Sequence, residues 1–166
     1  MGNGVSLYVI EKLMAEARKL AAEYRRATGK TLPISGEIAI NDAIRLLALE
    51  PVNEPTAGYD AIRHNAEGGV ERLQIKARVV FDEIKSSHRV GELKLDRPWE
   101  AVLLVLLDDN YEPFAIYEAP RPAIEVALED ARPNKRGTLT VPRFQRIGEL
   151  VWSRDVVDAA LEIPVP

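Results

Sequence analysis

The sequence predicts an α/β fold in which a small mixed central sheet is flanked by helices. Apolar residues recur at helical spacing before residue 50, a segment of alternating polarity with a glycine-containing turn follows, and Ala101 to Leu107 is apolar at every position. A strand that is apolar throughout is typical of a sheet centre covered on both faces. Helical segments before and after the strands would supply the covering layers.

The composition fits a globular protein of this class. The chain has 166 residues, of which 46% are hydrophobic and 29% are charged. We expect residues 1–154 to form one α/β domain with an N-terminal helix, and residues 155–166 to form a C-terminal tail. No apolar run approaches the roughly 20 residues that a membrane span needs, so we expect no membrane partner.

Cysteine content and charge exclude or disfavour some chemistries. The chain contains no cysteine, which excludes disulfides, thiolate metal sites and cysteine nucleophiles and makes the cytoplasm the expected location. The net charge of −4 argues mildly against a nucleic-acid partner, because such proteins are often basic. A local basic run nevertheless extends from Arg132 to Arg146 without an acidic residue.

Two helices are predicted first, over about residues 5–28 and 36–48. Gly29 is suited to end the first helix, and Ser35 is expected to be the N-cap of the second. The apolar residues at helical spacing are Leu7, Ile10, Leu13, Met14, Ala17, Leu20, Ala21 and Tyr24 in the first helix, and Ile38, Ile40, Ala43, Ile44 and Leu47 in the second.

A β-hairpin is predicted next, with strands at 58–64 and 70–81 and the turn at 67–69. Residues 82–98 are polar and receive no assignment. Two more strands, at about 100–107 and 113–119, are joined by a turn at 108–110, and helices are predicted at 122–131 and 142–152. Alternation along the second hairpin strand places Leu73, Ile75, Ala77 and Val79 on one face and Arg72, Gln74, Lys76 and Arg78 on the other.

This hairpin is expected to bring a carboxylate, an amide and an amine together. If residues 67–69 form a three-residue loop, Ala66 pairs with Val70, and Asp60 lies opposite Lys76 with the Cβ atoms about 5 Å apart. Gln74 shares the face of Lys76 because the two are two residues apart on one strand. A bulge in the turn would shift this register by one residue.

Such a group of side chains suits phosphodiester hydrolysis. Mg²⁺ (or Mn²⁺) prefers oxygen ligands, which Asp60, the Gln74 side chain and the Ile75 main-chain carbonyl can supply. Lys76 would orient a water nucleophile or stabilise charge on the phosphate. A buried lysine beside a metal ion can also act as a base.

The segments Gly58-Tyr59-Asp60 and Leu73-Gln74-Ile75-Lys76 resemble the Gly-x-Asp … Gln-x-Lys signature of the Mrr-like branch of the PD-(D/E)xK restriction-endonuclease-like superfamily. The resemblance covers roughly residues 35–120 and implies a core with the order helix, three-strand meander, helix, strand. The hairpin and the strand at 100–107 match the meander only in part, because the segment 82–98 intervenes. The family often takes an acidic residue from a preceding helix, and Glu37 matches that position. Gln74 stands where an acid is commoner, which removes one negative ligand.

The resemblance implies a metal-dependent nuclease that acts on DNA by water attack on a phosphodiester. Its catalytic residues would be Glu37, Asp60, Gln74 and Lys76, and its Mg²⁺ or Mn²⁺ ligands Glu37, Asp60, Gln74 and Ile75. The basic residues expected to contact nucleic acid are Arg72, Arg78, Lys135, Arg136, Arg143 and Arg146. A homodimer is a further expectation, because a domain this small often pairs to cut both strands.

Other interpretations stay open. Glu37 also suits a helix dipole, Asp60 a loop cap, and Gln74 and Lys76 the solvated face of an edge strand. The basic run is equally typical of a solvated surface. One alternative is therefore a catalytically weak or inactive nuclease-fold module that binds nucleic acid or another protein. Another is a small-molecule or protein-binding α/β domain.

Overall fold

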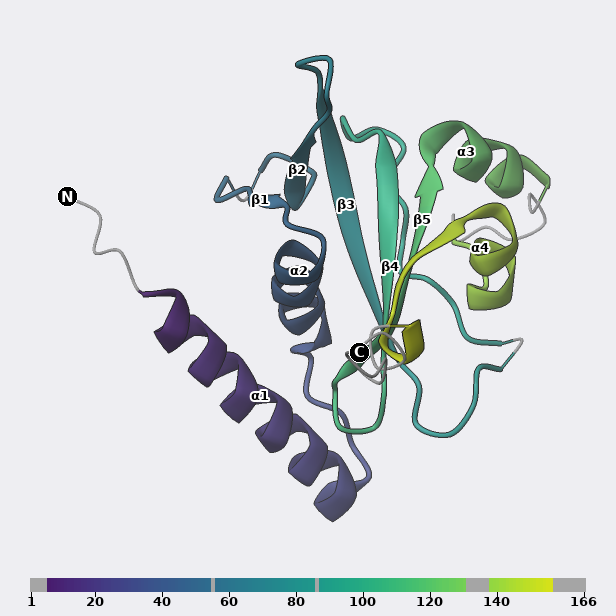
Figure 1. Ribbon diagram of the computed structural model, residues 1–166. Helices are drawn as coiled ribbons and strands as arrows, with labels where there is room; N and C mark the ends of the chain where they lie inside the picture. The colour runs from purple at the N-terminus through teal and green to yellow at the C-terminus, as the bar shows by residue number, and fades with distance from the viewer. Residues whose placement is uncertain (1–5, 55, 86, 131–137, 157–166) are drawn as a thin grey trace, which may run out of the picture.

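Among the residues that the structure describes, six strands form one mixed sheet with helices on both faces (Figure 1). The computed structural model describes residues 6–54, 56–85, 87–130 and 138–156. The sheet order follows the sequence: β1 (Glu50–Pro51), β2 (Ala61–His64), β3 (Val70–Val79), β4 (Ala101–Leu107), β5 (Pro113–Pro120) and β6 (Glu149–Ser153). Neighbouring strands are antiparallel except β3 and β4, which are parallel. The predicted mixed α/β architecture is confirmed.

Strand β4 lies in the middle of the sheet and separates two apolar cores. All seven of its residues are buried, as its uninterrupted apolar sequence predicts. Leu103 and Val105 face the core under α1 (Leu7–Thr28) and α2 (Ser35–Leu46). Leu104 and Leu106 face the core under α3 (Arg121–Asp130) and α4 (Val141–Ile147). None of these described helices is long and apolar enough to cross a membrane.

A buried ion pair joins α1, α2 and the turn after β4. Arg18 of α1 donates to Asp42 of α2, with 2.7 Å between Nη1 and Oδ2, and to the carbonyl oxygen of Tyr111 at 2.7 Å. Both side chains are buried, and the pair is extended by Arg45, 3.4 Å from Asp42, and by Glu112, 3.8 Å from Arg18. The predicted N-cap of α2 is wrong: Ile34 occupies this position, and no side chain caps the helix.

The predicted helix over 142–152 is only partly correct. Helix α4 ends at Ile147, and the chain then enters β6, which pairs with β5. Gly148 makes this change of direction possible, because a Cβ atom there would lie 2.7 Å from the carbonyl oxygen of Glu118. Helical spacing of apolar residues could not reveal this close backbone approach.

The connection from β3 to β4 crosses one face of the sheet instead of forming a tight turn. Because β3 and β4 are parallel, residues 80–100 must return the chain to the starting end of the sheet. Val90, Leu93 and Trp99 anchor this connection in the second core. The expectation that the strand at 100–107 belongs to an antiparallel meander is wrong. β1, β2 and β3 form one antiparallel succession, and β4, β5 and β6 form another.

Candidate active site

The β2–β3 hairpin pairs two residues away from the predicted register. Ala61 lies opposite Leu73, so the loop comprises residues 66–68 and not 67–69. Asn65 sets this loop, because its N–H donates to the Gly69 carbonyl at 3.0 Å and its Oδ1 accepts from the Gly69 N–H at 2.7 Å. Gly68, with φ of 82°, supplies the left-handed residue that such loops need.

The predicted position of Asp60 opposite Lys76 is therefore wrong. Continuing the observed pairing places Asp60 level with Gln74. A shift of two residues leaves each side chain on the same face of its strand, because strand side chains alternate with a period of two. Asp60, Gln74 and Lys76 consequently stay near one another, although the predicted register was wrong.

Asp60 lies where the pairing between β2 and β3 ends. Its N–H donates to the Leu73 carbonyl at 2.8 Å, and its Oδ2 accepts from the Ile75 N–H at 2.7 Å. The N–H and carbonyl of one strand residue point to the same side, so the Ile75 carbonyl faces this open edge of β3 as well. The loop-capping role considered for Asp60 is thus real, and it fixes the carboxylate in place.

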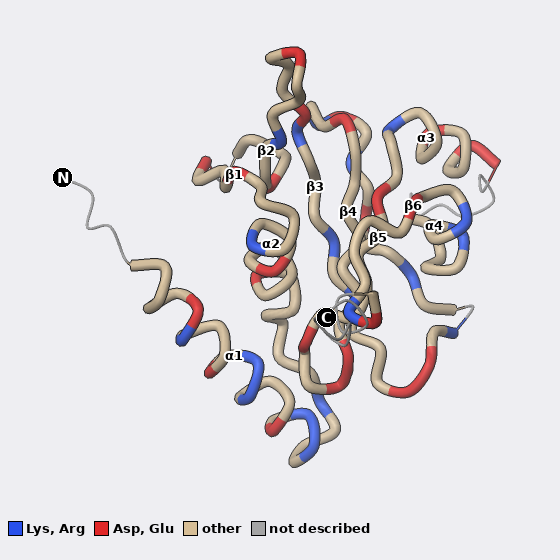
Figure 2. The backbone as a smooth tube through the Cα atoms, viewed as in Figure 1, with Lys and Arg blue, Asp and Glu red and all other residues tan. Residues whose placement is uncertain are grey.

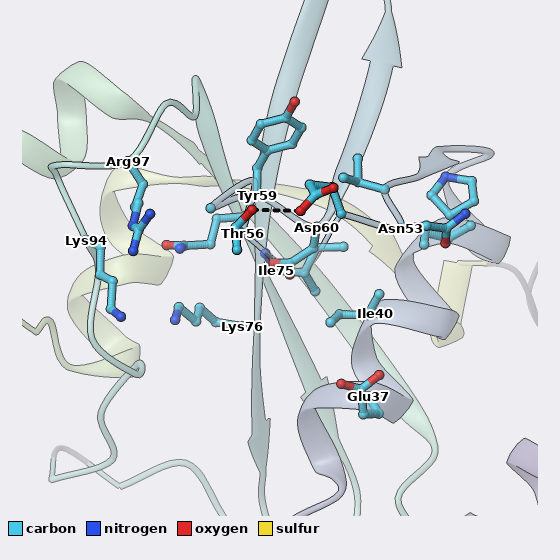
Figure 3. A pocket seen from close by; sticks show the side chains of 16 residues that line it. Glu37, Ile40, Asn53, Thr56, Tyr59, Asp60, Ile75, Lys76, Lys94 and Arg97 are labelled. Carbon is cyan, nitrogen blue, oxygen red and sulfur yellow. Dashed lines mark hydrogen bonds between the residues drawn. The ribbon is translucent and has the colours of Figure 1, made fainter.

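A cavity of about 650 Å³ opens at this edge of β3, and all the predicted catalytic residues line it (Figure 3). Glu37 comes from the first turn of α2, and Asp60 from the loop before β2. Gln74 and Lys76 come from β3. Ile75 lines the cavity too and packs in the core beneath α2, while its two neighbours face away from that core. The site therefore collects groups from both faces of the sheet.

The charges in the cavity influence one another. Burial raises the pKa of Asp60, and the negative charge of Glu37 raises it further, against the opposing effects of the Ile75 N–H and Lys76. Burial lowers the pKa of Lys76, and the charge of Lys94 lowers it further, against the effect of Asp60. A cation beside the two carboxylates would relieve their repulsion, and an anion would relieve that between the lysines.

Gln74 lines the cavity and carries an unpaired polar atom. Its side chain is nearly buried at 7% relative exposure, and Oε1 has no hydrogen-bond partner among the described residues. An unpaired buried amide oxygen costs free energy, so such atoms normally have a partner. Two carboxylate residues, Glu37 and Asp60, thus line the cavity together with Gln74 and Ile75, and carboxylate, amide and carbonyl oxygens are the ligand types that Mg²⁺ prefers. No cluster of three or more His, Cys, Asp or Glu side chains in the described residues could hold a metal ion by itself.

Two basic residues of the site were missed by the sequence analysis. Lys94 and Arg97 line the cavity from the β3–β4 connection, and neither forms an ion pair with a described residue. Gly58 allows this approach, because a Cβ atom there would lie 2.8 Å from Cδ of Arg97, and its φ is 83°. Nothing in the sequence indicated that the unassigned segment 82–98 returns to the hairpin.

Two of the arginines predicted to contact nucleic acid lie on β3 but outside this cavity. Arg72 is engaged in an ion pair with Glu100, and its guanidinium lies 5.9 Å from the ring centre of Tyr59. Arg78 lines a separate cavity near the start of α2. Neither arginine lines the cavity that holds Lys76.

The basic run lies elsewhere in the molecule. Arg143 and Arg146 belong to α4, which covers the opposite face of the sheet from α2 (Figure 2). Arg143 is 3.3 Å from Asp130 in an ion pair. Lys135 and Arg136 fall outside the described residues. The structure thus does not bring the described part of this run to the candidate site.

Comparison with known proteins assigns no family. No protein-family model matches the chain, and a search of curated proteins found no match either. The function must therefore be argued from the geometry and chemistry of the cavity.

Proposed function

We propose that this chain is a metal-dependent phosphodiesterase, specifically a nuclease that cuts DNA. The convergence of Glu37, Asp60, Gln74 and Lys76 on one cavity carries this proposal. A helix, a loop and a strand each contribute polar side chains to this cavity, and the Gln74 Oε1 has no hydrogen-bond partner among the described residues. Carboxylates, a neutral oxygen and a lysine are the groups that metal-assisted cleavage of a phosphodiester requires.

The order of the elements also supports a restriction-endonuclease-like core. Helix α2 is followed by the antiparallel strands β1, β2 and β3, and then by the parallel strand β4. This order matches the restriction-endonuclease-like order of helix, three-strand meander, helix, strand, except for the helix between the meander and the last strand. In place of the second helix, the described residues of the connection from β3 to β4 form no helix. The meander uses the short β1, whose strand character the sequence did not reveal.

Each group at the edge of β3 has a separate task in the proposed site. The carboxylates of Glu37 and Asp60, the Gln74 Oε1 and the Ile75 carbonyl would hold Mg²⁺ or Mn²⁺. A bound ion would supply charge neutralisation at the phosphate and a more acidic water. Asp60 needs little reorganisation for this role, because the Ile75 N–H already holds one of its oxygens. Its other oxygen, Oδ1, stays available.

The lysines and the arginine would act on the phosphate. Lys76 is half-buried, and its lowered pKa makes proton exchange with an attacking water easier than for an exposed lysine. Lys94 and Arg97 line the same cavity with no ion-pair partner in the described residues, so their charges are available to the flanking phosphate backbone. The potential that a phosphate meets in the cavity depends on these nearby cations more than on the net charge of −4.

Cleavage of DNA by variants with an intact fold tests the proposal. Purified protein is incubated with double-stranded DNA, single-stranded DNA or RNA, with Mg²⁺, Mn²⁺ or a chelator. Lys76→Ala should lower the metal-dependent rate by at least about 100-fold. Lys12→Ala, on the exposed side of α1, is the matched control and should cut like the wild type. Equal rates for wild type and Lys76→Ala, or no metal-dependent cutting by the folded wild type, would exclude the proposal.

A second function, a nuclease-fold module that binds without cutting, is favoured by one observation. The site has Gln74 in place of an acid, and the described residues offer no cluster of three acidic or histidine ligands. Metal-independent DNA binding that is weakened by Lys94→Ala, without cleavage under any condition, would identify this function. The homodimer and the cytoplasmic location stay predictions, and sedimentation at several protein concentrations tests the former.

A further inference from the structure

Helix α1 lies along the outside of the domain and carries apolar side chains on its outer face (Figure 1). Its buried residues, Arg18, Ala21 and Ala22, all belong to its second half. Leu13 and Leu20 are 54% and 58% exposed. These two leucines are seven residues apart, so they lie on one side of the helix, opposite Arg18. The helix therefore has a second apolar face, which is directed away from the core.

The outer face has the apolar spacing of a helix that packs against another helix. Apolar residues recur along it at alternating steps of three and four residues: Ile10, Leu13, Ala17, Leu20, Tyr24 and Ala27. None of these six residues is buried. Alternating steps of three and four are the heptad repeat of helices that pair along their length. This apolar stripe extends through most of the 22 residues of α1 and is suited to a helical partner.

Four charged residues of alternating sign border the apolar stripe on one side. They are Lys12, Glu16, Lys19 and Glu23, and all four are exposed. Their spacing would allow ion pairs within the helix. None of them, however, forms an ion pair with a described residue. These charges are therefore available to a partner that lies against the stripe.

The row of charges is complementary to itself when it is read backwards. The steps between the four residues are four, three and four, so the reversed row has the same spacing and the opposite sign at each position. An antiparallel second copy of α1 would place Lys12 opposite Glu23. The same copy would place Glu16 opposite Lys19, and two-fold symmetry repeats both pairs. Antiparallel packing also brings the same flank of both helices together, which a parallel pair does not.

The apolar residues fit the same antiparallel register. Leu13 of one copy lies level with the space between Leu20 and Tyr24 of the other, as a side chain that inserts into a hole of the facing helix must. Ala17 lies beside the two-fold axis, where its small side chain permits a close approach of the helices. Charge and shape thus favour one register.

We propose that the outer face of α1 binds the same face of a second copy of this chain in antiparallel orientation. The size of the domain suggested a homodimer without indicating a surface, and this inference assigns the surface. It does not depend on the proposed nuclease, because no residue of α1 lines the candidate active-site cavity. One helix pair buries a small area, so we expect a Kd on the order of 10 μM.

Sedimentation equilibrium of the full chain, from about 1 μM to about 500 μM, tests the apolar part of the interface. Leu13→Ser should weaken dimerisation by about tenfold or more, because each dimer loses two buried leucines. The matched control is Val126→Ser, at a residue of α3 that is 61% exposed, and it should dimerise like the wild type. Both positions are exposed in the single chain, so neither variant should unfold.

Charge reversal tests the antiparallel register. The doubly substituted variant Lys12→Glu/Lys19→Glu has an entirely acidic row, and Glu16→Lys/Glu23→Lys has an entirely basic one. Each variant alone should dimerise about tenfold or more weakly than the wild type, and this loss should shrink at high salt. An equimolar mixture should form a heterodimer at least as tight as the wild-type dimer. Charges that act only within their own helix would give no such rescue on mixing.

Three results would overturn the proposal. They are a wild type that stays monomeric over the whole range, a Leu13→Ser variant that dimerises like the wild type, and charge-reversed variants that do not pair when mixed. A monomeric wild type that co-sediments with vesicles of phosphatidylcholine and phosphatidylserine, and loses this in Leu13→Ser, would replace the second copy with a lipid surface.

Discussion

Asp60 has two roles that a single substitution can separate. Its Oδ2 accepts the Ile75 N–H at 2.7 Å, which caps the open edge of β3, and its negative charge belongs to the proposed metal site. In Asp60→Asn the side-chain oxygen can still accept this hydrogen bond, but the charge is gone. We therefore expect the variant to keep the fold while losing divalent-ion binding and cleavage.

The stability of the metal-free variant can be worked out from the pKa of Asp60. Burial raises this pKa above its usual value of 3.8, so folding favours the protonated carboxyl, which asparagine resembles. The raised pKa stabilises the wild type below pH 3.8, and this contribution is lost as the pH rises through the raised value. Asp60→Asn should thus match or exceed the wild type in unfolding free energy at neutral pH, an advantage that disappears in acid.

Alanine at this position provides the contrast. Asp60→Ala leaves the Ile75 N–H without its acceptor, which should lower the free energy of unfolding by about 1–2 kcal/mol. Urea denaturation at neutral and acidic pH measures both variants, with Asp109→Asn in the exposed turn after β4 as the control. Calorimetric titration with Mn²⁺ should show affinity reduced by more than about 100-fold in Asp60→Asn. An asparagine variant that is destabilised at neutral pH, or that binds Mn²⁺ like the wild type, would refute this reasoning.

Three further predictions concern the framework of the site. Asp42→Ala leaves Arg18 buried without its partner and should cost about 3–5 kcal/mol in urea denaturation, and a loss below 1 kcal/mol would contradict a buried pair. Gly58→Ala, at φ of 83° and against the Arg97 side chain, should lower the unfolding free energy by more than about 1 kcal/mol and weaken DNA binding in a fluorescence-anisotropy titration; unchanged stability would show that the backbone there is not strained. Leu103→Ala, in a fully buried position of β4, should cost about 2–5 kcal/mol by the same denaturation measurement, and a near-neutral result would place Leu103 outside the core.

The sequence alone determined the features that depend on local periodicity. Helix α1, the buried strand β4 and the apolar face of β3 follow from the spacing of apolar residues, because burial on one face or two leaves a period in the sequence. The sequence also singled out Glu37, Asp60, Gln74 and Lys76, which line the candidate cavity together, although it missed Lys94 and Arg97. The strand faces of Asp60, Gln74 and Lys76 were predicted correctly although the hairpin register was wrong, because a shift of two residues returns each strand side chain to the same face.

Only the tertiary structure decided how distant segments meet. The hydrogen bond from the Gly69 N–H to the Asn65 side chain fixes the hairpin loop. The parallel pairing of β3 and β4 requires a return connection, which places Lys94 and Arg97 beside the cavity. Gly148 approaches the β5 backbone closely, and the chain continues as β6 instead of a helix. These outcomes depend on contacts between residues far apart in the chain or on one backbone torsion. Neither leaves a periodic trace, because a long-range contact constrains single residues and not the repeat of a segment.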